Sequence, residues 1–489
     1  MPELKESDGG QKVASKGDQA LTSVKRYSDE EYRSKYGFSD PTQNYTVKGI
    51  KGLSEDVVKE IARLHDEPAW MEQMRLKALK HFTERGLPAW APELAHINFQ
   101  DFYYYATPTS SAAKSWNELP EYIRKTYDKL GITEAEKNFL SGVGAVYESE
   151  AVYHSIQKEL EKQGVVFTDT VTALKEYPEI MKRYFGTVVP YQDNYIAALQ
   201  TAVWSAGSFV YVPEGVSVKM PLQAYFRINA ERMGQFERTL IIAEPGSEVS
   251  YIEGCSAPVY ASQSLHSAVV EILAKKGSVV KYTTLQNWSK DVYNLVTKRA
   301  HAYEDATVSW VDFNGGSRLT RKYPSVYLLG PRAKADIISV AYAGAGQVQD
   351  TGGKAIHLAK DTTSKIISRS VSKDGGHTAY RGLLHVAKGA HNVKSTVRCD
   401  ALLIDAKSTT ATYPYMEINE DDASITHEAS VGKIGEEQLF YLNARGISEG
   451  DALSMIVNGF MEPFAKELPM TYAVEFNRIM ALEMTNAVG

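Results

Sequence analysis

Cysteine is almost missing from this chain, which has only Cys255 and Cys399 among its 489 residues. The sequence contains no Cys-x-x-Cys pair and no His-Glu-x-x-His motif, so a zinc site made of four cysteines is excluded. A cytosol keeps thiols reduced, and a chain of this length does not need a disulfide to fold. We therefore predict two free thiols. Any metal held by sulfur must share other types of ligand or a second chain.

Long apolar runs and an excess of basic residues are missing as well. No run approaches the roughly 20 apolar residues that span a bilayer, and the opening stretch MPELKESDGGQKVASKGDQ has no apolar core of a signal peptide. We expect a cytoplasmic protein without a membrane segment. The net charge is -6, and no cluster of Lys and Arg is interleaved with aromatic residues, so nucleic acid is not an expected partner.

The residues that are present divide the chain into four regions. Residues 1–45 are polar and without sustained periodicity, which predicts a flexible arm. Residues 46–205 are predicted to be mainly helical, residues 206–425 to form a β-rich core, and residues 426–489 to be helical again.

Three local patterns indicate helices in the outer regions. Thr133 and Glu136 form a capping box before a helical stretch predicted to reach Lys162, and Ser448 with Asp451 begins a C-terminal helix. The earliest pattern is an apolar series at helical spacing with a glycine stop, formed by Met71, Met74, Ala78, Leu79, Phe82 and Gly86.

After about Tyr211 the sequence consists of short Val, Ile, Tyr and Thr runs separated by Gly, Lys and Asp, which is typical of β-strands. A local pattern of a small or polar pair followed by a β-branched residue returns at intervals of 31, 28, 30, 29 and 26 residues. Its anchors are Val249, Val280, Val308, Ile338, Ile367 and Val393. Such a repeat favours a β-solenoid of stacked coils. A β-sandwich with evenly spaced hairpins is the alternative.

The glycine-rich stretch AYAGAGQVQDTGGKA does not form a phosphate loop. Gly346 and Gly352 are too far apart, and Lys354 is followed by Ala355 where such a loop needs Ser or Thr. We therefore expect no nucleotide hydrolysis by this chain.

Cys399 lies in an alternating run, STVRCDALLI, so Val397 and Cys399 face one way while Arg398 and Asp400 face the other. A cysteine among Val, Ala and Leu is most often a small buried hydrophobe. The segment ASITHEAS adds His427 and Glu428, which an extended strand separates and a turn brings together. Cysteine, histidine and carboxylate are ligands of iron. A mixed set of this kind would hold a cluster less firmly than four thiolates.

Cys255, in YIEGCSAP, follows a predicted strand and precedes a turn, where a thiol is able to react. An inert thiol is the plainer interpretation. A cysteine hydrolase is disfavoured because no oxyanion-hole signature accompanies the cysteine and histidine residues.

A series of longer motifs carries a family resemblance from about residue 45 to the C-terminus. The motifs, in order, are YFRINAE, YIEGCSAP, LQNW, VTKRA, HEAS, KIGEEQLFYL, RGISEGDA and MIVNGF. They resemble the SufB/SufD family, and within it the SufB scaffold subunits, of the SUF iron-sulfur cluster assembly system. The resemblance implies a right-handed parallel β-helix core, mainly β with helical ends, and a non-catalytic scaffold.

The same resemblance implies partners. SufD, or a second SufB copy, would associate through the β-helices, and the ATPase SufC through the C-terminal helices. SufE or SufU, with a cysteine desulfurase, would donate sulfur, and apo iron-sulfur proteins would receive the product. The apolar stripe of the last helix either packs within its own domain or, by resemblance, docks the ATPase; it consists of Leu453, Ile456, Val457, Phe460, Phe464 and Leu468.

The resemblance also assigns site residues. Cys255 would accept persulfide sulfur, which would pass through the β-helix interior toward Cys399 along Arg227, Asn229, Gln286, Trp288 and Lys298. Hydrogen-bond donors suit such a path because a persulfide anion is costly to bury without them. Cys399 and Glu428, with His427, would bind a transient [2Fe-2S] or [4Fe-4S] cluster. The resemblance also raises reduced flavin as a ligand of the complex.

The sequence departs from the family at two places. Thr426 stands where many members have a second carboxylate, and an N-terminal cysteine motif of some members is missing. Two other functions are open to a β-helix, namely that of a carbohydrate lyase and that of a purely structural solenoid that binds proteins. The lyase is disfavoured because the sequence shows neither a signal peptide nor a cluster of acidic residues.

Overall fold

The computed structural model describes most of the chain. The residues that it describes are 47–48, 51–89, 91–107, 118–121, 123–125, 140–228, 232–256, 263–468, 473, 476–477 and 480. The predicted arm of residues 1–45 and the capping box at Thr133 lie outside the described residues.

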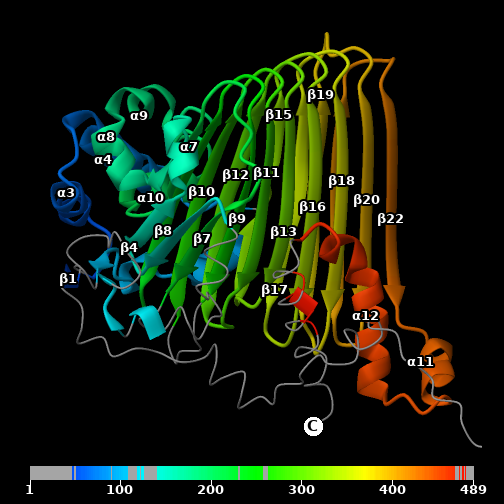
Figure 1. Cartoon of the computed structure of the whole chain (residues 1–489). Coiled ribbons are helices and arrows are strands. Elements are labelled where there is room, and N and C mark those ends of the chain that lie inside the picture. The colour runs from blue at the N-terminus through cyan, green and yellow to red at the C-terminus, as the bar shows by residue number, and fades with distance from the viewer. Residues whose placement is uncertain are drawn as a thin grey trace, which may run out of the picture.

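Two long sheets face each other and form a parallel β-solenoid of about seven turns (Figure 1). The predicted solenoid is therefore confirmed. The first sheet contains β5 (Val166–Asp169), β6 (Ser208–Val212), β8 (Gly234–Ala243), β10 (Ser264–Ala274), β12 (Val292–Ala302), β14 (Leu319–Lys322), β15 (Ser325–Leu328), β17 (Val348–His357), β19 (His377–Val386) and β21 (Thr409–Ile418). The second sheet contains β4 (Glu150–Ile156), β3 (Gly142–Tyr147), β7 (Leu222–Arg227), β9 (Glu248–Ser256), β11 (Val279–Asn287), β13 (Thr307–Gly315), β16 (Lys334–Ala343), β18 (Thr363–Ser372), β20 (Lys394–Leu403) and β22 (Ser424–Lys433).

The chain alternates between the two sheets, and each coil stacks on the one before it in register. Val249, Val280 and Val308 are register partners, as the repeat predicted. The prediction is wrong for the next anchor, Ile338, which is not a register partner of Val308. Val308 pairs with Ala335, whereas Ile338 pairs with Val311. Arg332, with φ 61°, takes the left-handed position before β16 as Asp305 does before β13, so the corner is of the same kind, and the visible anchor Ile338 lies three residues beyond the partner of Val308.

One corner of several coils contains a residue with left-handed backbone. Gly246 and Gly277 fill this position in two coils, and Asp305 fills it in the next, with φ values of 67°, 66° and 57°. The Gly246 amide donates to the Lys276 carbonyl of the following coil, and the Gly277 amide donates to the Glu304 carbonyl. The stacked corners therefore fix the register of the strands that follow them.

Strand alternation divides the side chains of each sheet between the solenoid interior and an outer face. The interior contains a continuous apolar cluster that includes both cysteines, Cys255 and Cys399. Polar and charged side chains are also buried there, and they form the candidate site described below.

Helices of the N-terminal region cover the outer face of the first sheet, at its N-terminal end (Figure 1). The predicted helical region 46–205 also contains β3, β4 and β5, which extend the solenoid sheets. Its other elements are β1 (Val47–Lys48), α3 (Glu55–Leu64), α4 (Ala69–Arg85), η2 (Pro92–His96), η3 (Phe99–Asp101), β2 (Ala106–Thr107), α7 (Lys158–Lys162), α8 (Thr170–Glu176), α9 (Pro178–Tyr184) and α10 (Tyr195–Val203).

Two helix predictions have different outcomes in this region. Helix α4 ends at Arg85 with Gly86 at its C-cap, as the apolar series and the glycine predicted. The helix predicted to reach Lys162 is wrong, because β3 and β4 form an antiparallel hairpin from Gly142 to Ile156. Alternating Val, Ala and Tyr residues pack this hairpin onto β7, and that tertiary pairing outweighs local helix propensity.

The C-terminal helices α11 (Glu436–Asn443) and α12 (Glu449–Ala465) follow the last strand (Figure 1). The Ser448 hydroxyl accepts a hydrogen bond from the Asp451 amide at 3.2 Å, so the predicted N-cap is confirmed. The predicted boundary between residues 425 and 426 falls inside β22, which continues the solenoid to Lys433. Helix α12 packs on the outer face of the second sheet.

Among the residues that the structure describes, no helix has the length and apolar character needed to cross a membrane.

Candidate functional site

Cys255 points into the solenoid from β9 and is buried beside a carboxylate. Its Sγ donates a hydrogen bond to Glu253 Oε1 at 3.4 Å. The other oxygen of Glu253 accepts the hydroxyl of Tyr282. Because Glu253 and Cys255 are two residues apart on one strand, both side chains face the interior. The thiol therefore lies in a polar pocket of the core and not on a surface turn.

A group of buried charges faces this thiol from both sheets. Lys298 Nζ lies 2.9 Å from Asp312 Oδ1, and Lys322 Nζ lies 3.5 Å from the same oxygen. Lys322 also donates to Gln286 Oε1 at 3.2 Å, and Gln286 is the register partner of Cys255. Lys322 is thus held close to the thiol, and Lys298 and Asp312 belong to the same buried group on strands beyond it, all without exposure to solvent.

The surroundings change the protonation of these groups. Burial, followed by the nearby carboxylates of Glu253 and Glu237, raises the pKa of the Cys255 thiol well above its ordinary value. Burial lowers the pKa of Lys322 to about 8. Burial opposes the charge of Asp312, but Lys298 and Lys322 outweigh it and lower the pKa of Asp312. At neutral pH the resting thiol is therefore protonated, and Asp312 of the same buried group is ionised.

Three residues of the predicted sulfur path belong to this buried group. Gln286 on β11, Trp288 directly after that strand and Lys298 on β12 are all buried. Arg227 is also buried and ends β7, where it is the register partner of Ser256, the residue after Cys255. Asn229 lies outside the described residues.

Several buried polar atoms of the interior have no hydrogen-bond partner in the described part of the chain. They include two donors next to the thiol, Gln286 Nε2 and Trp288 Nε1, and the acceptors Asp312 Oδ2 and Asn314 Oδ1. Buried polar groups are normally paired. Their arrangement leaves hydrogen-bonding capacity inside the solenoid for a small polar species.

Cys399 lies on the same inner face as Glu253, several coils further along. In-register pairing places it in one row of inward-facing positions, in which Ala429 follows Cys399 on the last strand; the polar part of the row consists of Glu253, Thr284, Asp312, Ser339, Ser368 and Cys399. Every member of this polar part is, like Cys399 itself, buried. The prediction that Cys399 shares a face with Val397 agrees with the apolar cluster that contains both.

The Cys399 thiol is buried to the same extent as Cys255 and is also protonated at rest. Burial raises the pKa of Cys399 to about 12; the Tyr380 hydroxyl opposes this shift by hydrogen bonding, and Asp400 adds to it. Asp400 itself faces outward, where it accepts hydrogen bonds from Arg398 Nε at 2.9 Å and Ser430 Oγ at 2.7 Å.

The structure separates the residues predicted to bind metal with Cys399. Strand β22 is extended, and Glu428 pairs in register with Arg398, whose Nη1 lies 3.7 Å from its carboxylate. Glu428 therefore shares the outward face with Thr426. His427 is the register partner of Val397 and so lies on the face of Cys399. Both His427 and Glu428 are exposed.

Among the described residues, one group of three has ligand atoms that all lie within 4.8 Å of one another. It consists of His391, Glu420 and Asp422 near the corner of the last coils, and it is largely exposed. Neither cysteine belongs to it.

The apolar stripe of α12 is used within the chain. Val457 and Phe464 are buried in a cluster with Val311, Phe313 and Val340 of the second sheet. Leu453 and Leu468 are also buried, whereas Ile456 and Phe460 are partly exposed. This arrangement corresponds to the alternative in which the stripe packs on its own domain. The large apolar side chains that remain exposed here are Phe440, Tyr441 and Met455.

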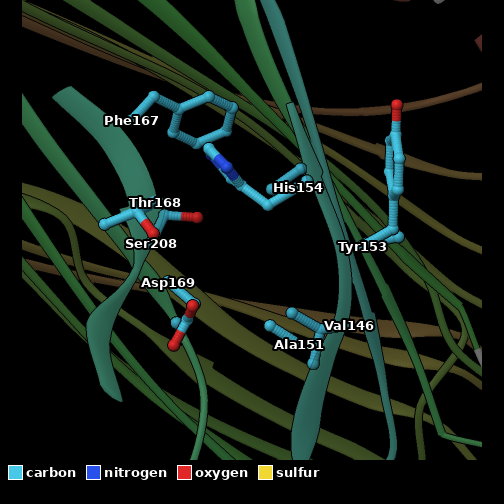
Figure 2. A pocket seen from close by; sticks show the side chains of 12 residues that line it. Val146, Ala151, Tyr153, His154, Phe167, Thr168, Asp169 and Ser208 are labelled. Carbon is cyan, nitrogen blue, oxygen red and sulfur yellow. The ribbon is translucent and has the colours of Figure 1, made fainter. Parts of the chain in front are cut away.

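A small pocket is lined by residues of β3, β4 and β5 together with Ser208 and Ala224 (Figure 2). Ala224, which lines it, is the register partner of Glu253. Ser208, also in its wall, hydrogen-bonds to the Tyr251 hydroxyl at 2.7 Å. His154 and Asp169 flank the cavity in Figure 2. The pocket therefore reaches the polar row at its N-terminal end.

Sequence reasoning did not find Glu253, Tyr282, Asp312 or Lys322. A signal for the first was available, because Glu253 lies two positions before Cys255 in a strand and must share its face. Asp312 and Lys322 lie on separate strands, and only the register brings them to the thiol.

Known proteins resemble this chain over nearly its whole length. Residues 226–460 match the SufBD core domain of SUF system FeS cluster assembly, and residues 110–224 match the SufBD protein N-terminal region. Iron-sulfur cluster assembly SufBD family proteins of Staphylococcus aureus strain MRSA252 and Staphylococcus haemolyticus strain JCSC1435 are each 54% identical over 455 residues, which is 93% of this chain and 98% of the relative. With in-register β-coils, both thiols in the interior and these matches, the chain belongs to the SufBD family of the SUF iron-sulfur cluster assembly system.

Proposed function

We propose that this chain is a SufB-type scaffold on which iron-sulfur clusters are built. Cys255 accepts persulfide sulfur, and Cys399 binds the nascent cluster as cargo. The observation that carries the proposal is the buried polar row that begins beside Cys255, at Glu253, and ends at Cys399. A SufD-type subunit that neither accepts sulfur nor binds a cluster would not need a buried polar row between two thiols.

The row suits the transport of a small anionic sulfur species. Lys298 and Lys322 supply positive charge, and Gln286 Nε2 and Trp288 Nε1 are donors without a protein acceptor in the described part of the chain. Charge-assisted hydrogen bonds offset the cost of burying an anion. Ser339 and Ser368 continue the polar surface toward Cys399.

The cluster end of the row lies at the second-last strand of the second sheet. His427 shares the face of Cys399, and Glu428 joins the ligand set when its ion pair with Arg398 opens. That pair is solvent-exposed, and exposed pairs contribute only about 0 to 1 kcal/mol. The ion pair is therefore a weak restraint, and an iron shared with Cys399 would have to sit at the free edge of the last coil, because Glu428 lies on the outward face of β22.

The partners follow from the family and from the exposed surfaces. We propose that a SufD-type paralogue or a second copy binds along the final coil, and that the SufC ATPase binds at Phe440, Tyr441 and Met455 near α11 and α12. A SufE- or SufU-type donor with its cysteine desulfurase supplies sulfur in the cytoplasm, and apo iron-sulfur proteins accept the cluster.

The test is anaerobic reconstitution with iron and sulfide, followed by visible absorbance. Cys399→Ala is expected to lose most of the cluster absorbance, and His427→Ala and Glu428→Ala to reduce it. Cys255→Ala is the matched control: it retains absorbance with free sulfide but fails to take sulfur from a persulfide donor. Unchanged absorbance in Cys399→Ala would contradict the assignment.

A further inference from the structure

We propose that Glu253 is the proton acceptor that activates Cys255 for sulfur transfer. The inference rests on the sulfur-acceptor role proposed above for Cys255 and adds a residue that acts on the reacting sulfur atom.

The geometry around Glu253 is that of a positioned base. One carboxylate oxygen lies 3.4 Å from Cys255 Sγ and accepts its hydrogen bond. The second oxygen accepts the hydroxyl of Tyr282, which fixes the carboxylate from the neighbouring strand. Glu253 and Tyr282 are both fully enclosed by the solenoid. The acceptor is therefore oriented toward the thiol before any donor arrives.

The thiol needs such a partner. A thiolate, and not a thiol, is the attacking nucleophile, whereas the surroundings of Cys255 keep the proton on sulfur at rest. Removing this proton to bulk water would leave an uncompensated charge in the core. Transfer to an adjacent carboxylate keeps the total charge of the group constant.

The step balances without an outside oxidant or reductant. The Cys255 sulfur attacks the outer sulfur of a donor persulfide, R–S–SH, while its proton moves to Glu253. The donor S–S bond breaks, and the departing thiolate takes the proton back from Glu253. The products are Cys255 persulfide and R–SH, so a sulfur atom is transferred and the carboxylate is regenerated.

The neighbouring charges favour a negative sulfur once the proton has moved. Lys322 lies against Gln286, the register partner of Cys255, and its charge lowers the pKa of that thiol. The titratable groups that face the pair from the surrounding strands are Glu237, Tyr251, His266, Tyr282, Lys298, Asp312 and Lys322. Glu253 is distinguished from all of them by its contact with the sulfur.

Glu253 has Thr284 as its register partner on one neighbouring strand, and on the other it has Ala224, which belongs to the pocket of Figure 2. Ala224 lines the pocket and stands in register with Glu253, and Gly144 stands in register with Ala224. Both small residues line the pocket, so its wall adjoins the strand position of Glu253.

The test measures sulfur loading of the full chain by glutathione persulfide as a function of pH. Mass spectrometry follows the gain of one sulfur on the Cys255 peptide. Glu253→Gln keeps the shape of the side chain but removes the acceptor, so loading at pH 7.5 is expected to slow by about tenfold or more. The deficit relative to the parent is expected to shrink as pH rises, because hydroxide then forms the thiolate.

Two further variants separate this role from a loss of packing. Tyr282→Phe removes a donor to Glu253 and leaves a stronger base, so loading is expected to be faster than in the parent. Glu248→Gln, an exposed carboxylate on the same strand, is expected to match the parent. Circular dichroism and the unfolding midpoint report whether each variant is folded.

The failures are distinguishable. A parent chain that gains no sulfur at Cys255 overturns the acceptor role of that cysteine. A parent that loads while Glu253→Gln loads equally fast at every pH overturns the role of Glu253. Should Glu253→Gln fail to fold, a Tyr282→Phe rate equal to or below the parent rate overturns that role instead.

Discussion

Several buried charges of the chain are held by partners of opposite sign, and His65 on the N-terminal side of the molecule is an example. Its Nε2 lies 2.8 Å from Glu150 Oε1, and its Nδ1 lies 3.3 Å from Glu67 Oε1. Glu67 is in turn bound by Arg75. Burial opposes a charge on His65, but Glu150 and Glu67 outweigh it and raise its pKa.

This shift predicts a pH dependence of stability. Because the folded pKa of His65 exceeds the unfolded value of about 6.5, its contribution is fully present below that value and is lost as pH rises through the folded pKa. The urea midpoint is expected to fall between pH 6 and pH 8.5, and more steeply in the parent than in His65→Gln. His96→Gln, at an exposed histidine, should retain the parental slope; equal slopes in all three proteins would contradict the prediction.

A second buried pair fastens the N-terminal helices to the first sheet. Arg238 Nη2 lies 2.6 Å from Glu271 Oε2, with both side chains fully buried, and Glu271 also accepts the amides of Gly186, Val188 and Val189. Glu271→Ala leaves the guanidinium without its carboxylate and is expected to cost about 3 to 5 kcal/mol in the free energy of unfolding.

The comparison for Glu271→Ala is the exposed pair of Lys276 and Glu304. Lys276→Ala is expected to cost less than about 1 kcal/mol. Urea unfolding of both variants measures the difference. A small effect in both would show that the buried pair does not fasten the helices.

At the scale of single elements, α12 is attached to the second sheet by its apolar stripe. Phe464 is 1% exposed and packs against Phe313 and Phe476. Phe464→Ala is expected to destabilise the protein by about 3 to 5 kcal/mol, because it leaves a cavity. Met455 lies on the same helix but is 55% exposed, so Met455→Ala is expected to change the free energy of unfolding by no more than about 0.5 kcal/mol. Equal urea midpoints for the two variants would contradict this packing.

Elements whose apolar pattern is complete within one segment were predictable from the sequence. Helix α4 and helix α12 carry both their stripe and their end signals locally. The stacked coils were predictable because each repeats a short local motif. The β3–β4 hairpin was mistaken for helix because its strands are stabilised by β7, which lies far away in sequence.

The candidate site was predictable only in part for a related reason. The inward orientation of Cys399 follows from alternation within β20. The approach of Lys322 and Asp312 to the Cys255 region depends on the register of separate coils, which local patterns do not encode. Between Val308 and Ile338 the visible repeat departed from that register by three residues, although Ile338 and Ile367 pair with each other, so no continuous row of interior residues could be assembled from the sequence.

At the scale of the whole molecule, the solenoid ends in two strands that each have one neighbour, β21 and β22. Their outer edges present backbone donors and acceptors that another strand can pair. Apolar side chains are exposed on the same strands, namely Tyr413, Tyr415, Met416, Ile418 and Val431. We propose that the paralogous partner, or a second copy, continues the sheets from this coil.

Charges placed on this coil are expected to prevent that association. Tyr415→Lys combined with Val431→Lys should weaken binding of the partner by at least about tenfold, since lysine on an edge strand opposes strand addition. Leu87→Lys introduces the same charge at an exposed apolar residue of the helical end and should leave binding intact. Analytical gel filtration of the mixed subunits measures both, and unaffected assembly of the double variant would rule out this edge.

The register of the coils also sets a length. Five strand steps separate Glu253 from Cys399 along the inner row, and at about 4.8 Å per step the two ends lie roughly 24 Å apart. A sulfur atom attached to Cys255 extends only a couple of bond lengths, so no swinging side chain bridges that span. Under the function proposed above for Cys255 and Cys399, the cargo would leave the first thiol and travel unattached before the second captured it. Insertion or deletion of one whole coil would change the transit distance without altering the chemistry at either end.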